Sequence, residues 1–340
     1  MPAFEKQSIH FSKFPASLLL GIPLFFPLPL LAAEQVVPPV PRVKQEPQLK
    51  ILDSIDAERN YWSGEFSSLA GAIDRFFGDD RNFQEGNESV IQLDLTSASG
   101  YGEPRKITLS GRARLRLPMT ERKLHLLVET DPEKNLSNEN KKSQPTLHNN
   151  VTAPSSVALA ARYEREVKER WLYSTDAGIQ FRGLTARPNP FIRARTSYLK
   201  PLDQWRMKAY ETLFWFNSIG AGETTQLDLE RVISEPVLFR ASSIATWLHI
   251  GQNFDLRQDL SLYHTLSERT ALLYQASAIG VSRPQLQVTD YVLLMVYRYR
   301  LHREWAFFEF SPQLHFPKEM NYRYSPQIQI RLEVLLDESR

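Results

Sequence analysis

Apolar and polar residues alternate with a period of two along most of the chain after residue 88. In residues 106–117 one face is apolar or small throughout, and the other carries Lys106, Thr108, Ser110, Arg112, Arg114 and Arg116. Successive side chains of a β-strand point to opposite faces, so this pattern predicts a strand with one apolar and one charged face. A turn at 118–121 and a second alternating run at 123–129 complete a predicted β-hairpin.

The same alternation recurs at regular intervals from residue 171 to residue 336. Candidate strands begin near positions 171, 189, 205, 223, 237, 254, 270, 287, 304 and 323. Short turns such as 200–203 join them, which is the connectivity of an up-and-down meander. With the hairpin they predict about 12 antiparallel strands, an even number as in single-chain bacterial barrels. A further alternating stretch at 90–96 would make the count odd, so its place inside or outside the barrel stays open.

The segment before the strands has a helical period instead. Phe66, Leu69, Ala70, Ile73, Phe76 and Phe77 share one face at the spacing of an α-helix. Ser63 can cap the start of this helix, and Gly78 can end it. Its apolar stripe either packs against the rest of the protein, forms a plug at a barrel mouth, or contacts a membrane interface.

Two polar segments interrupt the alternation. Residues 131–154 are rich in Asn, Lys, Glu, Ser and Pro and predict a mobile insertion. Counting strands back from a periplasmic C-terminus places the long insertion at 131–168 on the periplasmic side. From 156 to about 170, Glu164 and Lys168 stand four residues apart in the order that supports a helix. A short solvated helix is one interpretation of this run, and an elongated strand start is the other.

The N-terminus has the layout of a secretory signal peptide. A weakly basic stretch precedes an apolar run at 16–31, and the small residues Ala32 and Ala33 follow. Cleavage is expected after Ala33. The alternative, a membrane-spanning helix, is disfavoured because prolines interrupt the apolar run. The chain therefore divides into a signal peptide at 1–33, a linker and N-terminal helical, periplasmic segment at 34–100, and a β-barrel at 101–340.

The composition excludes several classes of function. The chain has no cysteine, so it can form no disulfide, no thiolate metal site and no acylated cysteine anchor. Its net charge of +2 gives no bulk field to recruit nucleic acid. It contains no Gly-rich phosphate loop, HExxH or EF-hand pattern, so we predict neither a metal site nor a cofactor.

Three features separate the predicted strands from those of a soluble sandwich. They have the length of transmembrane strands, roughly 9–11 residues, their turns are short, and aromatic residues gather near their ends. Those aromatic residues are Trp171, Trp205, Trp215, Trp247, Trp305, Tyr297, Tyr299, Tyr322 and Tyr324. On these features residues 106–336 resemble the bacterial outer-membrane β-barrel class. The last strand departs from that class, which usually ends on an aromatic residue, because it ends on Leu335 and Leu336 followed by polar residues.

The resemblance implies an all-β fold, an antiparallel up-and-down transmembrane β-barrel with a short N-terminal helical appendage. It implies a location in the cell outer membrane, reached through the signal peptide. The implied partners are outer-membrane lipid and the barrel-assembly machinery, with no nucleic acid. The implied role is structural, binding or permeability, and the substrate stays open.

If the apolar faces contact lipid, the charged faces line the lumen. Their most concentrated feature is a candidate lumenal basic row of Arg112, Arg114, Arg116, Arg193 and Arg195. Two interpretations stay open. The arginines pair with acidic residues and fill the interior, or they form a basic lumen that admits anions or binds lipid phosphate.

No catalytic residue is assigned. The nearest candidate for a Ser–His lipid hydrolase is His264 with Ser267, and alternation puts them on opposite faces of a strand. His249, His302 and His315 lie near strand ends without an acidic neighbour in sequence. A non-enzymatic barrel is the leading hypothesis. A membrane-embedded lipid hydrolase and a soluble periplasmic β-rich binding protein are the alternatives.

Overall fold

The computed structural model describes the strands and a few residues of the segment before them. The described residues are 69, 72–73, 76–77, 89–100, 104–117, 123–134, 136, 156–167, 170–183, 187–301 and 305–337. The predicted signal peptide at 1–33 and most of the polar insertion at 131–154 lie outside them. Among the described residues no helix is long and apolar enough to cross a membrane.

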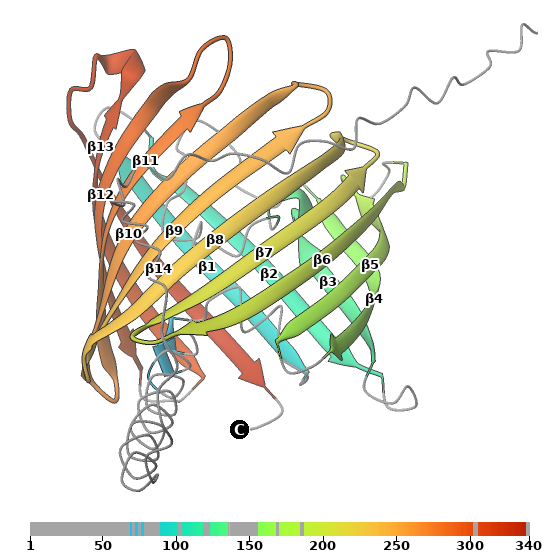
Figure 1. The fold of residues 1–340 in the computed structure, drawn as a ribbon, viewed down its shortest axis with the longest axis horizontal. Coiled ribbons are helices and arrows are strands. Elements are labelled where there is room, and N and C mark those ends of the chain that lie inside the picture. Colours follow the sequence, from blue (N-terminus) through green and yellow to red (C-terminus); the bar gives the residue numbers. More distant parts are fainter. Residues whose placement is uncertain are drawn as a thin grey trace, which may run out of the picture. The chain divides into compact units, whose positions relative to one another are not determined.

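Fourteen antiparallel strands form the described part of the chain (Figure 1). They are β1 (Val90–Gly100), β2 (Lys106–Arg116), β3 (Leu124–Thr130), β4 (Val157–Val167), β5 (Trp171–Phe181), β6 (Asn189–Leu202), β7 (Trp205–Phe216), β8 (Gly220–Ser234), β9 (Val237–Leu248), β10 (Asn253–Ser267), β11 (Thr270–Val281), β12 (Gln287–Arg300), β13 (Ala306–Pro317) and β14 (Ser325–Asp337). Two short 3-10 helices, η1 (Pro132–Lys134) and η3 (Lys318–Met320), follow β3 and β13.

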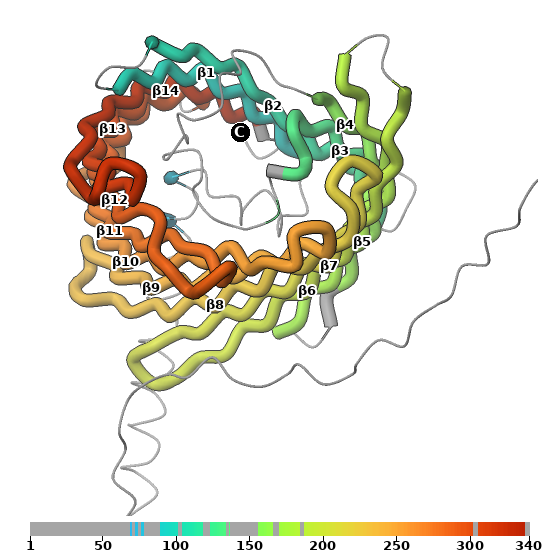
Figure 2. Tube along the Cα trace, turned by 90° about the horizontal axis from the view of Figure 1, so that it is seen from above, coloured from blue at the N-terminus to red at the C-terminus, as the bar shows by residue number. Residues whose placement is uncertain are grey.

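The strands close into one ring, which Figure 2 shows from above. Each strand pairs with its neighbours in sequence, and β1 pairs with β14. That closing register runs from Val90 opposite Asp337 to Gly100 opposite Gln327. A closed ring leaves no unpaired sheet edge, which is the condition for a β-structure to lie in lipid. β14, which ends without an aromatic residue, is therefore paired along almost its full length.

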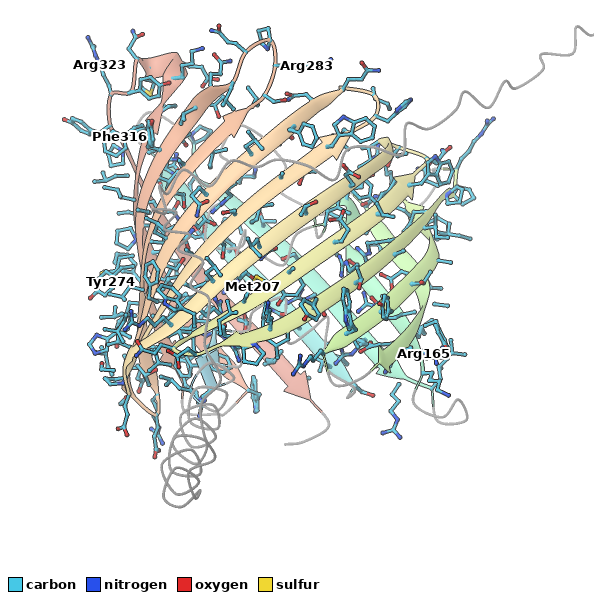
Figure 3. The ribbon with its side chains drawn as sticks, viewed as in Figure 1. Arg165, Met207, Tyr274, Arg283, Phe316 and Arg323 are labelled. Carbon is cyan, nitrogen blue, oxygen red and sulfur yellow. The ribbon has the colours of Figure 1, made fainter. Side chains whose placement is uncertain are left out.

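Inside and outside alternate along every strand, and the apolar side faces out. Leu109, Leu213 and Leu293 are about half exposed, whereas Arg114 and Arg193 are fully buried. Figure 3 shows Tyr274 and Phe316 on the outer side of the wall, with charged residues at its rims. A soluble protein would show the opposite arrangement. The alternative of a soluble sandwich is therefore wrong, because all strands belong to one closed sheet whose apolar face is exposed.

Two expectations from the sequence need correction. The barrel has 14 strands where about 12 were expected, because the stretch at 90–96 is part of β1 and residues 157–167 form β4. The helix considered for 156–170 is wrong, and its strand alternative is confirmed. In β4 the side chains of Ala158, Ala160 and Arg162 are buried while Leu159 and Tyr163 are exposed. The hydrogen bonds with β3 and β5 stabilise the strand. A helical ion pair would contribute only a few tenths of a kcal/mol to the alternative helix.

The extra strand also changes the end of the barrel at which the chain leaves β3 and enters β4. β1 begins and β14 ends at the same end, where the two-residue turns 203–204, 235–236 and 268–269 lie. The chain leaves β3 and enters β4 at the opposite end. The periplasmic placement of the insertion is therefore wrong if the C-terminus is periplasmic. One missed strand reverses the end at which every earlier loop is placed.

Aromatic side chains mark both ends of the wall, as the sequence predicted. At the end with the short turns, the rings of Trp171 and Tyr198 lie 4.5 Å apart between centroids. At the other end, the rings of Tyr291 and Tyr322 lie 5.8 Å apart. Such pairs are typical of the two interfaces between lipid and water.

Candidate functional site: the inner wall of the barrel

Buried ion pairs connect β3, β4, β5 and β6 on the inner wall. Asp176 on β5 is opposite Arg162 on β4 and Arg193 on β6 in the strand register, so its carboxylate lies between two guanidinium groups. Arg162 Nε donates to Asp176 Oδ1 at 2.6 Å, and Arg193 Nε donates to Asp176 Oδ2 at 2.8 Å. Arg193 Nη2 also donates to Glu129 Oε1 on β3 at 2.5 Å. This group is the first lumenal network.

A second network lies where the ring closes. Arg298 on β12 donates to Glu309 on β13 and, through Nη2, to Glu333 Oε1 on β14 at 2.6 Å. Arg331 on β14 donates through Nη2 to Glu309 Oε1 at 2.5 Å. Gln92 on β1 donates to Glu333 Oε2 at 3.0 Å. All of these side chains are nearly or fully buried, so the network joins the first and last strands through charge-assisted hydrogen bonds.

A smaller group lies between the two networks on β7, β8, β9 and β10. Glu230 on β8 accepts from Arg206 Nε at 2.8 Å and from Arg240 Nε at 2.7 Å. Arg240 also donates to the Tyr263 hydroxyl at 3.1 Å. Glu230 is therefore held between two guanidinium groups, as Asp176 is.

The five arginines of the predicted basic row do not form one row. Arg112 joins the second network, since its Nε and Nη2 donate to Gln92 Oε1 at 2.9 and 2.8 Å. Arg193 belongs to the first network, and Arg195 is two residues further along the inner face of β6. Arg114 is fully buried and Arg116 is half-buried, both on the inner face of β2. Arg193 is paired with acidic neighbours, because its guanidinium donates to both Asp176 and Glu129.

The two halves of the inner wall differ in charge. The described inward side chains of β2–β6 include seven basic ones, Lys106, Arg112, Arg114, Arg116, Arg162, Arg193 and Arg195, and three carboxylates, Glu129, Glu164 and Asp176. Among the described inward side chains of β7–β14 and β1, basic and acidic residues are nearly equal in number. The basic ones are Arg206, Lys208, Arg240, Arg257, Arg298, Arg300 and Arg331, and the acidic ones are Asp94, Asp228, Glu230, Asp255, Asp259, Asp290, Glu309 and Glu333.

The geometry inside and outside the ring decides the class of this protein. The strands pair without an edge, and β8 and β10 each run for 15 residues, more than enough to cross a lipid core. The large exposed apolar side chains lie on the outside, and the buried charged side chains face the inside. The chain has the fold of an outer-membrane β-barrel.

Comparisons with known proteins return structures of the same kind. The chain is similar to OprB of Pseudomonas putida (TM-score 0.45, 7% identity, 76% of this chain and 97% of that chain). It is also similar to the outer membrane channel DcaP of Acinetobacter baumannii (0.42, 8%, 73% and 96%) and to the NanC porin (0.38, 8%, 71% and 98%). No protein-family model matches the sequence, and no curated protein matches it.

An apolar surface covers part of the inner wall of β9–β13. Leu238, Tyr263, Ala271, Leu273, Val292, Leu294, Val296 and Phe307 form it, and we call it the apolar pad. Ile73, Phe76 and Phe77 of the N-terminal segment pack on this pad and are buried there. The Phe76 ring meets the Phe307 ring edge-on at 5.9 Å, and the Phe77 ring meets Tyr263 edge-on at 5.2 Å.

The N-terminal segment has a helical conformation where it is described. Leu69, Ala72, Ile73 and Phe76 are helical, and the Phe77 N–H donates to the Ile73 carbonyl at 2.9 Å. The Arg300 guanidinium lies 5.3 Å from the centre of the Phe76 ring, within the range of a cation–π contact. The described part of the apolar stripe therefore packs on the inner wall, as the first of the three interpretations expected.

The candidate hydrolase pair does not form a site. Alternation puts His264 on the outer face of β10, and the Ser267 hydroxyl accepts from the Arg269 backbone N–H at 3.2 Å. A register shift between Thr265 and Ser267 pairs Ser267 with Thr270, but among the described contacts no hydrogen bond joins the Ser267 hydroxyl to His264. Among the described residues no group of His, Cys, Asp and Glu is arranged to hold a metal ion.

One polar pair on the inner wall was not found from the sequence. His315 Nδ1 on β13 lies 2.8 Å from Asp290 Oδ2 on β12, and the other Asp290 oxygen accepts from the Phe316 N–H at 3.0 Å. The two residues are 25 positions apart in sequence, so no local pattern joins them. Knowledge of the β12–β13 register would have been needed to pair them.

Proposed function

We propose that this protein is a permeability channel that favours anionic solutes. The observation that carries the proposal is the charge difference between the two halves of the inner wall. Six described arginines face inward on β2–β6 against three described carboxylates, while the rest of the wall is nearly balanced. Basic side chains along a passage lower the electrostatic cost for an anion and raise it for a cation.

The N-terminal segment narrows this passage in the proposed function. Ile73, Phe76 and Phe77 occupy space on the inner wall of β9–β13 that would otherwise be lined by the apolar pad alone. The described residues of the segment are held on the wall by packing and by ring contacts. It is therefore suited to reduce conductance in the resting state and to leave when its contacts are weakened.

The orientation in the membrane follows from the turns. Barrels of this class have short turns on the periplasmic side and longer loops outside the cell. The turns 203–204, 235–236 and 268–269 are at the end where β1 begins and β14 ends. We assign that end to the periplasm and the loops 131–156 and 318–324 to the cell exterior. Export through the signal peptide at 1–33 and insertion by the barrel-assembly machinery remain predictions.

Ion selectivity in planar lipid bilayers tests the proposal. The full mature chain, reconstituted between two different KCl concentrations, should show a reversal potential of the sign for chloride over potassium. Replacing Arg112, Arg114 and Arg116 with Gln should shift that potential towards zero. The single variants Arg116→Gln and Lys208→Gln, which each remove one positive charge from one half of the wall, make the matched comparison, and Arg116→Gln should give the larger shift. Potassium selectivity in the wild type would contradict the proposal.

The second candidate function is a closed scaffold, and the two buried ion-pair networks favour it. Asp176 and Glu309 each hold two arginines against the wall, which fills space in the interior. A double variant, Ile73→Asp with Phe76→Asp, separates the two candidates. If the wild type conducts weakly and this variant conducts strongly, the plugged channel is supported. If neither conducts, the protein is a scaffold and the channel proposal fails.

A further inference from the structure

The outer face of the barrel is not apolar all the way round. On β6–β10 it carries Thr196, Glu211, Glu223, Thr225, Ser243 and Gln258, which alternation and register turn away from the lumen. We call these six residues the outer polar patch. They are connected across strands: the Thr225 hydroxyl donates to Glu211 Oε2 at 2.7 Å, and the Ser243 hydroxyl donates to Gln258 Oε1 at 2.5 Å.

The patch reaches into the depth of the lipid core. On β7 the outward residues between Trp205 and Trp215 include Glu211, four positions before Trp215. At about 3.3 Å per residue and a tilt of about 40°, the two tryptophans span about 25 Å of height, the height of the apolar band of such barrels. Glu211 then lies about 10 Å inside the level of Trp215. A carboxyl group at that depth contacts hydrocarbon unless something else covers it.

Small residues accompany the polar ones. Ala194, Ala209, Ala221, Ala241 and Ala245 also face outward on β6–β9. The register places Ala245 beside Thr225, and Ala209 is two residues before Glu211 on β7. Small and polar side chains are thus neighbours on this face. Small residues let two membrane-embedded surfaces approach closely, and polar side chains then form hydrogen bonds between them.

The opposite face of the barrel shows what a purely lipid-facing wall looks like here. The outward side chains on β12–β14 are large and apolar, for example Leu293, Phe310, Leu314, Ile330 and Leu332. Among the described outward residues in the middle of these strands none carries a charge. The polar and small residues on β6–β10 are therefore a local departure and not a general property of the wall.

We propose that the outer polar patch is the surface through which copies of this chain associate in the membrane. Lipid tails cannot hydrogen-bond to Glu211 or Gln258, whereas a second copy can. Beyond the hydrogen bonds within one chain, the patch offers carboxylate oxygens of Glu211 and Glu223 as acceptors and the second N–H of the Gln258 amide as a donor. It is thus complementary to itself, which a contact between identical subunits requires. The proposal does not depend on the channel function.

Cysteine cross-linking in intact outer membranes tests this contact, because the natural chain has no cysteine. A Thr225→Cys variant of the full chain is treated with a short bis-maleimide and compared with Leu332→Cys on the opposite outer face. Both positions are exposed on the barrel surface. We expect a product of twice the chain's mass for Thr225→Cys and none for Leu332→Cys. Ala241→Cys repeats the test if the first variant fails to form a heat-modifiable barrel.

The other outcomes overturn the proposal. No product at Thr225 or Ala241, or equal product at Leu332, would mean that the patch faces lipid or that the chains meet at random. A product of any other mass would assign the patch to a different protein. Native mass spectrometry adds a second readout: Ala241→Trp should yield monomers, while Ala113→Trp, an outward alanine on β2, should keep the wild-type assembly.

Discussion

The inner walls of β3–β6 and β9–β13 are made of the same alternating strands but are stabilised in different ways. The first is held by guanidinium and carboxylate groups, with Asp176 at the centre of its network. The second carries the apolar pad, and the described residues of the N-terminal segment pack on it. The difference shows that inward positions match what they contact. Under the described N-terminal residues they are apolar, and around Asp176 they carry guanidinium and carboxylate groups that pair with one another.

The largest effect is expected in the charged wall. Asp176→Ala leaves Arg162 and Arg193 without the carboxylate between them, and an uncompensated buried charge costs about 3–5 kcal/mol. The free energy of unfolding, measured by urea titration in lipid or detergent, should fall by that amount. Ser174→Ala on the same inner face of β5 is the control and should change it by less than about 1 kcal/mol. Equal effects from both variants would contradict the network's role.

The apolar pad should respond to the loss of volume instead. Leu273→Ala opens a cavity in the pad and should lower the free energy of unfolding by about 3 kcal/mol. Leu272→Ala, the neighbour on the lipid side, should cost less because lipid fills the space that the side chain leaves. The same urea titration measures both variants. A larger loss for Leu272→Ala would show that the pad is not packed.

A smaller effect on the barrel is expected from the segment that covers the pad. Phe76→Ala removes the ring contacts with Phe307 and Arg300, each worth about 0.5–1.5 kcal/mol. The N-terminal segment should become more accessible to protease in folded barrels, while the barrel keeps its unfolding midpoint. A parallel fall in that midpoint would show that the segment is part of the barrel's own stability.

The smallest effect is expected outside both walls. Arg182 donates to Glu133 at 2.7 Å, but its side chain is 45% exposed. Exposed ion pairs contribute about 0.2–1 kcal/mol, so Arg182→Ala should change the free energy of unfolding by no more than that. Repeating the titration in high salt should reduce the wild type to the level of the variant. If Arg182→Ala lowered the free energy of unfolding as much as Asp176→Ala, ion pairs at the rim and in the lumen would be equally important for stability.

Much of the fold follows from the sequence because β-barrels repeat one short pattern. The alternation in residues 106–117 and 171–336 predicted the strands, the apolar outer face and the aromatic ends. β4 was not assigned as a strand, since its charged residues also fit a helix until the ladders with β3 and β5 are known. β4 and β1 together account for the difference in strand count, and β4 alone decides the end of the barrel at which the chain leaves β3.

The inner wall was harder to predict than the outer one. Its charged residues could be placed on a face, but their partners come from neighbouring strands and depend on the register. Arg193 and Glu129 are 64 positions apart in sequence, and Arg298 and Glu333 are 35 apart. The apolar pad was not predicted as a feature because Leu273 and Val296 are inward positions with the side chains expected outside.

The central claim is that these strands form a closed barrel in the outer membrane. Membrane fractionation followed by gel electrophoresis, with and without boiling, tests it most directly. The mature chain should be found in the outer-membrane fraction, and its mobility should change on heating because a closed barrel stays folded in detergent until it is boiled. Recovery of the chain as a soluble periplasmic protein with no change in mobility would contradict the account.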